Sequence, residues 1–199
     1  VAVCAENAIR MPGKPRIARE RCTLCGECAK VCPSGALKVM GDLMTVEEVY
    51  TLIDKDRIFY EKSAGGVTFS GGEPLIQWEF LLAMLEKLKR EGIHTAVETT
   101  GYAPWEIIDR IKERVDLFLY DLKILDDDAH RRAVGVSNEL VKENLKRLAS
   151  DGAEVIVRVP VIPGYTQSEN NIRNILEFVY SIGKIKTVHL LPYLSLIHI

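Results

Sequence analysis

Beyond Thr45 the chain alternates five short apolar runs with amphipathic helical patterns, and this alternation restricts its fold more than any other feature. The apolar runs predict strands at residues 67–69, 93–99, 116–121, 154–161 and 187–191. Strands that alternate with helices are typical of a parallel sheet that is covered by helices. We therefore expect an α/β fold, with a complete or partial (β/α) barrel as the leading architecture and a doubly wound open sheet as the alternative.

The helical patterns carry their apolar residues on one face. One such face runs from Leu81 to Leu88, with Leu or Met at positions i, i+3, i+4 and i+7. The first helix should begin at Thr45, because Thr45 and Glu48 have the spacing of a capping box. The other expected apolar faces consist of Val46, Val49, Leu52 and Ile53; Ile107, Ile108 and Ile111; Val141, Leu145 and Leu148; and Ile172, Ile175, Leu176 and Val179.

All five cysteines lie within the first 32 residues, and four of them follow the spacing C-x2-C-x2-C-x3-C-P between Cys22 and Pro33. This is the spacing of bacterial ferredoxins, which hold 4Fe-4S clusters. A zinc site is the alternative, but zinc motifs favour two separated pairs of ligands and do not require the trailing Cys-Pro. A secreted disulfide scaffold would usually spread an even number of cysteines through a short chain. We therefore expect an iron–sulfur protein of a reducing compartment, the cytoplasm.

An internal repeat extends this prediction, because the segment from Cys4 to Ile9 resembles the segment from Cys32 to Leu37. Cys4 would be the trailing cysteine of an earlier ferredoxin motif, and the trailing cysteine of such a run binds the other cluster. We expect Cys32 to start a short helix and to bind a second cluster whose remaining ligands precede Val1. The chain would then ligate only one cluster completely, through Cys4, Cys22, Cys25 and Cys28.

With 199 residues the chain can form one full domain with a small appendage. We place a ferredoxin-like 4Fe-4S insert at residues 1–42 and a partial barrel at residues 43–194, and we leave residues 195–199 unassigned as a tail that looks foreign. The net charge of -2 gives no sign of nucleic acid or an anionic membrane as a partner. No apolar run approaches the roughly 18 residues that a membrane span requires.

Polar residues follow the predicted strands where those strands end. In βα folds the C-terminal ends of the strands form one rim, at which ligands bind. Any one polar group there could be a solvated strand end, but together the carboxylates could hold an ammonium group while the cations hold a carboxylate. A ligand with both groups is an amino acid or carries an amino-acid end. The rim segments are Ser70-Gly71-Gly72-Glu73, Glu98-Thr99-Thr100-Gly101, Asp121-Leu122-Lys123 and the strand that contains Arg158.

S-adenosylmethionine has such an end, and it performs radical chemistry together with iron–sulfur clusters. The chain resembles the glycyl-radical enzyme activating enzymes, the radical S-adenosylmethionine group that activates pyruvate formate-lyase and its relatives. The likeness is to members with a ferredoxin-type two-cluster insert. It rests, in chain order, on the stretches GGVTFSGGEPL, AVETTGY, DLFLYDLK, HRRAVGVSN, VRVPVIPGY and HLLPY.

The resemblance implies a radical S-adenosylmethionine oxidoreductase with a partial barrel fold. S-adenosylmethionine would be cleaved reductively to a 5′-deoxyadenosyl radical. That radical would abstract hydrogen from a glycine Cα of a partner glycyl-radical enzyme. An electron donor such as flavodoxin or ferredoxin would be a second partner.

The resemblance also assigns residues to cofactor binding: Gly71, Gly72, Glu73, Glu98, Thr99, Asp121, Leu122, Lys123 and Arg158. The first three match the motif that holds the methionyl amino group, and Arg158 matches an arginine near the methionyl carboxylate. Glu98 stands where relatives often have Asp. His130 matches a histidine of the family pattern to which we assign no role; the alternative is a histidine on a helix surface.

Two departures from the family pattern lead us to expect a fragment. The Cys-x3-Cys-x2-Cys triad of the radical cluster is not in the chain and would precede Val1. Leu194 stands where the family has a cofactor-binding histidine. We therefore assign no catalytic residue within the chain and expect activity only in the full-length parent. The alternatives are a ferredoxin-type electron-transfer module fused to a noncatalytic βα domain, and a radical enzyme that acts on another substrate.

Overall fold

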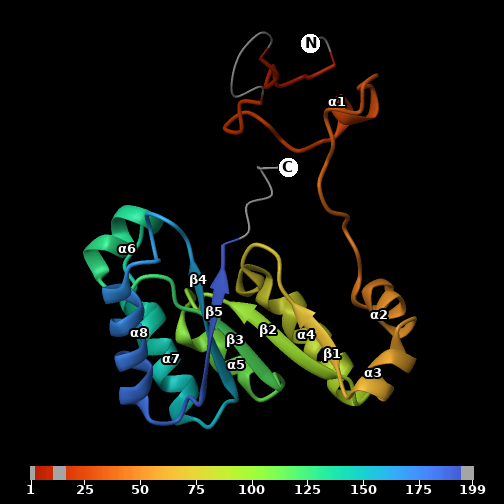
Figure 1. Cartoon of the computed structure of the whole chain (residues 1–199). Coiled ribbons are helices and arrows are strands. Elements are labelled where there is room, and N and C mark those ends of the chain that lie inside the picture. The colour runs from red at the N-terminus through yellow and green to blue at the C-terminus, as the bar shows by residue number, and fades with distance from the viewer. Residues whose placement is uncertain (1–2, 11–16, 194–199) are drawn as a thin grey trace. The chain divides into compact units, whose positions relative to one another are not determined.

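The computed structural model of the chain describes residues 3–10 and 17–193 and has two compact units, Val1–Met44 and Thr45–Ile199. The second unit contains a parallel sheet whose strands follow one another in chain order (Figure 1). These strands are β1 (Gly66–Phe69), β2 (His94–Thr99), β3 (Leu117–Asp121), β4 (Val155–Val161) and β5 (Thr187–Pro192). The tail at residues 195–199, like Leu194, lies outside the described residues.

The strand order confirms the partial barrel and shows that the doubly wound alternative is wrong. A doubly wound sheet reverses its strand order at a switch point. Here each strand pairs in parallel with the next one along the chain, and β1 and β5 are the two edges of an open sheet.

Two helices, α2 (Val46–Asp54) and α3 (Arg57–Ser63), precede β1. The other helices connect successive strands: the 3-10 helix η1 (Pro74–Gln77) and α4 (Trp78–Arg90) follow β1, and α5 (Trp105–Lys112) follows β2. After β3 come α6 (Asp127–Val134) and α7 (Glu139–Ser150), and after β4 comes α8 (Glu169–Ile182). Among the described residues, no helix is long and apolar enough to cross a membrane.

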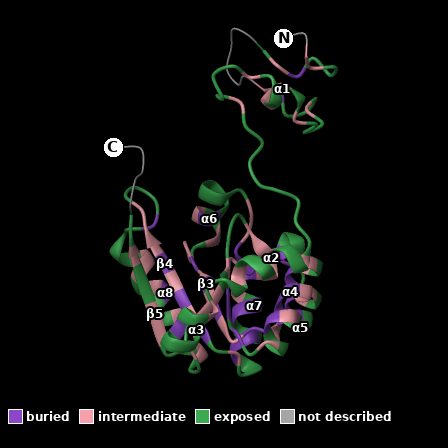
Figure 2. Ribbon diagram, turned by 90° about the vertical axis from the view of Figure 1, so that its right-hand side faces the viewer, coloured by how far each residue is buried: buried purple, intermediate pink, exposed green. Residues whose placement is uncertain are grey.

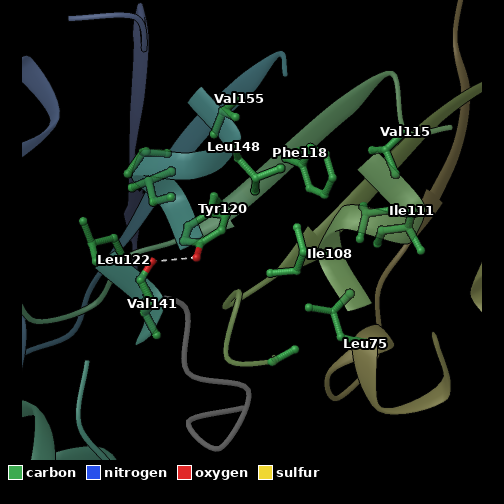
Figure 3. Close-up of a cluster of buried hydrophobic side chains, with 14 of the residues drawn as sticks. Leu75, Ile108, Ile111, Val115, Phe118, Tyr120, Leu122, Val141, Leu148 and Val155 are labelled. Carbon is green, nitrogen blue, oxygen red and sulfur yellow. Dashed lines mark hydrogen bonds between the residues drawn. The ribbon is translucent and has the colours of Figure 1, made fainter. Parts of the chain in front are cut away.

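Side chains alternate between the two faces of the sheet. On β3 and β4 every second residue, including Phe118, Tyr120 and Val155, is buried in a cluster with apolar residues of the helices (Figure 3). Asp121 and Arg158 occupy the alternate positions, which are only partly buried. Along β4, buried and partly buried segments alternate in the ribbon (Figure 2). The period of two along each strand thus separates an apolar face covered by helices from a face that carries charged groups.

The helix predictions are confirmed in most positions. The face from Leu81 to Leu88 and the face formed by Val141, Leu145 and Leu148 are buried, and Thr45 and Glu48 form the predicted capping box. Two positions are wrong, because Leu52 and Leu176 are 48% and 43% exposed. On each of the two helices the neighbouring apolar residues pack against the core, whereas Leu52 and Leu176 do not.

In the first unit the predicted helix at Cys32 is wrong. The short helix α1 (Glu27–Lys30) lies before Cys32 rather than after it. From Cys32 the chain instead enters a turn, in which Gly35 has a φ of 63° and its N–H donates to the Cys32 carbonyl at 3.1 Å. Positive φ favours glycine and interrupts a right-handed helix.

Glycine should be required at position 101, where the chain leaves β2 and turns toward α5. It has a φ of 66°, and an added Cβ would lie 1.8 Å from the Tyr120 hydroxyl oxygen. Tyr120 is buried, and its hydroxyl donates to the Val141 carbonyl at 2.7 Å (Figure 3). We expect Gly101→Ala to lower the free energy of unfolding by about 3 kcal/mol or more, because a steric clash adds to backbone strain. Urea denaturation followed by circular dichroism measures the loss.

Gly152→Ala is the matched control, since Gly152 has a φ of 84° but no atom within 4 Å of an added Cβ. It should cost only about 1 kcal/mol, the effect of backbone strain alone. Equal losses in the two variants would show that the packing around Tyr120 does not require glycine at position 101.

Candidate functional site

The loop after β1 leaves open space where a ligand could approach the backbone. Gly71 has a φ of 127°, and an added Cβ at Gly71 or Gly72 would meet no atom within 4 Å. The carbonyls of these two glycines accept no hydrogen bond from the described residues. Two free carbonyl oxygens beside an open surface can accept hydrogen bonds from an ammonium group.

The Glu73 carboxylate joins the loop after β1 to the loop after β2. It accepts hydrogen bonds from the Thr99 hydroxyl at 2.6 Å and from the Thr100 N–H and hydroxyl at 2.9 and 2.7 Å. A fourth bond, from the Leu75 N–H at 3.3 Å, caps η1. Two carboxylate oxygens accept about four hydrogen bonds, so Glu73 offers a ligand its negative charge rather than a free oxygen.

Four charged side chains from β2, β3 and β4 form one network on the face opposite the helices. Arg158 lies beside Asp121 in the register of β3 and β4, and its guanidinium approaches Glu98 at 3.0 Å and Asp121 at 3.6 Å. The Lys123 ammonium lies 3.4 Å from the second oxygen of Asp121. The Ser70 hydroxyl donates to Glu98 at 3.1 Å and so connects β1 to the network.

Two buried atoms at the centre of this network have no hydrogen-bond partner among the described residues: Asp121 Oδ1 and Arg158 Nε. Burial raises the pKa of Asp121, although Lys123 and Arg158 pull it down in part. Buried polar atoms are nearly always hydrogen-bonded in folded proteins. Asp121 Oδ1 and Arg158 Nε are the two atoms of the 3.6 Å ion pair, so they face each other at a separation too long for a hydrogen bond, and their burial is only partly compensated.

The structure thus brings together every predicted cofactor-binding side chain of the rim except Leu122, whose side chain points into the apolar core. The Leu122 side chain is therefore not available to a ligand. Thr99 is buried and serves Glu73 and the Gly101 N–H rather than open space.

Three asparagines that sequence reasoning missed hold the strand ends in place. Each side-chain amide donates two hydrogen bonds to backbone carbonyls. Asn138 binds the carbonyls of residues 124 and 125, Asn144 those of residues 101 and 103, and Asn171 those of residues 123 and 166. Asn138 and Asn144 are buried, and only their positions among helical polar residues in the sequence could have drawn attention to them.

His130 lies on α6, but the alternative of a surface histidine is wrong because only 6% of the residue is exposed. Its Nδ1 lies 2.7 Å from the Val136 carbonyl. His130 lines a cavity of about 290 Å³ that also reaches Glu73, Asp121 and Lys123.

Four of the five cysteines, those predicted to share one cluster, line the same small cavity in the first unit. The described residues contain no group of three or more Cys, His, Asp or Glu side chains that could hold a single metal ion. The thiolates of a 4Fe-4S cluster bind different iron atoms, so they stand farther apart than the ligands of one ion. The cysteines that line this cavity are Cys4, Cys22, Cys25 and Cys28, and four thiols around one cavity are compatible with the ligand set of one cluster.

The predicted internal repeat has a backbone counterpart. The Asn7 N–H donates to the Cys4 carbonyl at 3.1 Å, as the Gly35 N–H does to the Cys32 carbonyl, and both donor residues have positive φ. In each turn a later N–H donates to the cysteine sulfur, at 3.2 Å for Cys4 and 3.4 Å for Cys32. Backbone and Ser34 hydrogen bonds lower the pKa of Cys32 to about 7, which favours the thiolate that binds metal.

In a comparison with known protein families, the Radical SAM superfamily matches residues 16–179 of the chain. The chain is 44% identical to the isethionate sulfite-lyase activating enzyme of Oleidesulfovibrio alaskensis, over 97% of this chain and 63% of that relative. It is 37% identical to the trans-4-hydroxy-L-proline dehydratase activating enzyme of Clostridioides difficile, over 87% of this chain and 68% of that relative. The chain thus spans a little under two thirds of the first relative's length.

A solved structure shows the same fold at similar sequence identity. It is a domain of a pyruvate-formate lyase-activating enzyme from Bacteroides vulgatus, with a TM-score of 0.61 and 40% identity. The match covers 65% of this chain and 81% of that one.

The raised pKa of Asp121 predicts a pH-dependent contribution to stability. Between its unfolded pKa, about 3.9, and its higher folded pKa, the folded state binds more protons than the unfolded state, so stability falls as pH rises through this window. We expect the free energy of unfolding of wild type to fall relative to that of Asp121→Asn as pH rises from about 4 to about 7. Urea denaturation at stepped pH measures this difference.

Asp128→Asn removes an exposed carboxylate on α6 outside the network and is the matched control. A shift in the opposite direction for Asp121→Asn would show that the attraction of Lys123 and Arg158 outweighs burial.

Proposed function

Since the chain belongs to the radical S-adenosylmethionine superfamily and, within it, to the glycyl-radical enzyme activating enzymes, we propose that its full-length protein activates a partner glycyl-radical enzyme. The observation that carries this proposal is the charge network of Glu98, Asp121, Lys123 and Arg158 on the open face of the sheet. It lies at strand ends, where βα folds bind ligands. It also combines the two charges that the amino-acid end of S-adenosylmethionine requires.

The residues of the rim would bind and orient the cofactor. The carbonyls of Gly71 and Gly72 would accept hydrogen bonds from the methionyl ammonium, and the negative charge of Glu73 would favour it. The Arg158 guanidinium, which pairs with Glu98 and Asp121, would supply the positive charge that favours the methionyl carboxylate. When bound, S-adenosylmethionine and a 4Fe-4S cluster supply the radical that takes hydrogen from a glycine Cα.

The rim must also hold the reacting parts in a fixed geometry, because small misplacements strongly slow a reaction between two positioned groups. Lys123 is placed by the Asn171 amide, which binds its carbonyl at 3.0 Å. Thr100 is placed by Glu73. These contacts fix the ends of β2 and β3 before any ligand arrives.

The cysteines of the first unit would hold one 4Fe-4S cluster completely, and Cys32 would bind a second cluster together with ligands from outside this chain. An electron donor such as flavodoxin or ferredoxin would reduce the protein, and the cytoplasm is the compartment that suits these thiolate ligands. Clusters held by these cysteines would supply electron transfer, or would serve mainly as a docking or structural module.

Substitution of Glu73 should weaken the binding of S-adenosylmethionine to the full-length protein. Glu73→Gln keeps the size of the side chain but removes the negative charge that attracts the methionyl ammonium, and we expect this loss to be similar to that of a hydrogen bond to a charged group, about 1.5–3 kcal/mol. We therefore expect about 10- to 100-fold weaker binding, and a similar loss for Lys123→Ala. Isothermal titration calorimetry under anaerobic conditions measures the Kd.

Glu79→Gln is the matched control, because Glu79 is an exposed carboxylate in the first turn of α4. Full-length protein that binds iron but no S-adenosylmethionine would contradict the proposal. That result would favour a ferredoxin-type electron-transfer module fused to a noncatalytic βα domain.

The cysteine assignment predicts which variants lose iron. After anaerobic reconstitution with iron and sulfide, the chain should hold about four iron atoms in one cluster. Cys4→Ser should remove or degrade this cluster, whereas Cys32→Ser should keep it, because Cys32 is assigned to the second cluster. Iron analysis and electron paramagnetic resonance of the reduced protein measure the outcome. Equal loss in both variants would contradict the crossed assignment, and retention of zinc without iron would support the zinc alternative.

A further inference from the structure

A cavity beside the charge network has features that the binding of an amino-acid end does not use. Its volume is about 290 Å³, and one end reaches Glu73, Asp121 and Lys123. The other end is largely apolar and is formed by residues from η1, the loop after β2, α6 and α7. These are Ile76, Tyr102, Val134, Val136 and Val141, with His130 among them.

The orientation of the His130 ring follows from its one hydrogen bond. Nδ1 faces the Val136 carbonyl at 2.7 Å, and a carbonyl only accepts, so Nδ1 carries the proton. In the neutral ring Nε2 is then an acceptor. Nε2 makes no hydrogen bond to the residues that the structure describes, although His130 is only 6% exposed and lines the cavity.

The α6 segment that carries His130 is firmly built. Asp127, at the start of α6, accepts hydrogen bonds from the Ser137 hydroxyl at 2.7 Å and the Asn138 N–H at 2.8 Å. The Asn138 amide in turn binds the carbonyls of residues 124 and 125, directly after β3. The wall formed by α6 is therefore fixed relative to the end of β3, and the cavity is preformed.

We propose that this cavity is a specificity pocket for one side chain of the partner protein, next to the glycine that the reaction addresses. The inference rests on the proposed function, since it is the partner's glycine that must reach the rim. The side chain it fits has an apolar body and an O–H or N–H donor at its tip, which Nε2 of His130 accepts. Tyrosine meets this description, phenylalanine meets only its apolar part, and alanine meets neither.

The size and lining of the cavity favour a side chain over the cofactor. Sites for whole small molecules measure about 300–1,000 Å³, so this cavity lies at the lower limit and would not hold S-adenosylmethionine and a peptide together. Outside the charged rim its lining is mainly aliphatic, and the polar side chains there are His130, Thr100 and Tyr102. An apolar pocket with one buried acceptor suits a single amphipathic side chain.

The test uses the full-length protein and short fluorescent peptides. The peptides are Ala-Ala-Xaa-Gly-Ala-Ala and Ala-Ala-Gly-Xaa-Ala-Ala, with Tyr, Phe or Ala at Xaa, and fluorescence anisotropy in the presence of S-adenosylmethionine gives the Kd. A hydrophobic pocket separates side chains that differ by a methylene or more by about 10-fold or more. In one of the two series we expect the Tyr peptide to bind at least about 10-fold more tightly than the Ala peptide, with Phe between them.

Val134→Trp should fill the pocket and abolish this preference. Val134 is 48% exposed at the end of α6, so a larger side chain there should not prevent folding. Arg132→Trp adds the same side chain at an exposed position of α6 that does not line the cavity, and it should leave the preference unchanged. His130→Phe should keep the preference for Phe over Ala but lose that for Tyr over Phe.

The outcomes separate this inference from the proposed function. If the wild-type protein does not bind S-adenosylmethionine, the proposed function is contradicted, and the pocket with it. Normal S-adenosylmethionine binding with equal affinity for all peptides would overturn the pocket alone. If Val134→Trp weakens S-adenosylmethionine and leaves the peptide preference intact, the cavity belongs to the cofactor and the inference is wrong.

Discussion

The alternation of side chains along β3 and β4 is the constraint on which the site depends. Phe118, Tyr120 and Val157 must face the helices, because their burial drives the packing of the second unit. Asp121 and Arg158 then have to face the other way, and the register of the two strands sets them side by side. A slip of one residue would exchange the two sets and bury both charges. The energy that specifies the core therefore also specifies the site.

Backbone carbonyls at the strand ends raise a second problem, because the loops that leave a sheet cannot pair them with a neighbouring strand. Asn138, Asn144 and Asn171 solve it in the same way, each donating both amide hydrogens to two carbonyls. Each amide connects a helix to a strand end. Because the rim is already held in this way, it needs little rearrangement to bind a ligand. Binding therefore does not lose the affinity that ordering the loops would otherwise cost.

Local periodicity explains how much of this could be predicted from the sequence. All five strands, the open barrel and the charged rim were expected, because patterns of two and 3.6 residues report which face is buried. No comparable pattern in the sequence predicts α3, the buried position of His130 or the three asparagines, since these depend on contacts between distant segments. Leu176 was expected in the core, but only its neighbours on α8 reach it. Periodicity identifies a face of a helix, whereas its width depends on the partner.

The charge network is incompletely satisfied by the residues around it, and this has a consequence for binding. Burial raises the pKa of Asp121 even though two cations lie close by, so the desolvation of its carboxylate is not fully offset. The Nε of Arg158 faces this carboxylate at 3.6 Å, too far for a hydrogen bond. An amino-acid end at the rim would add its ammonium near Glu73 and its carboxylate near the Arg158 guanidinium, where the attraction acts at reduced dielectric. The charges whose burial is not fully compensated are thus the same charges that would hold an amino-acid end, which is why they lie on the open face of the sheet and not in its core.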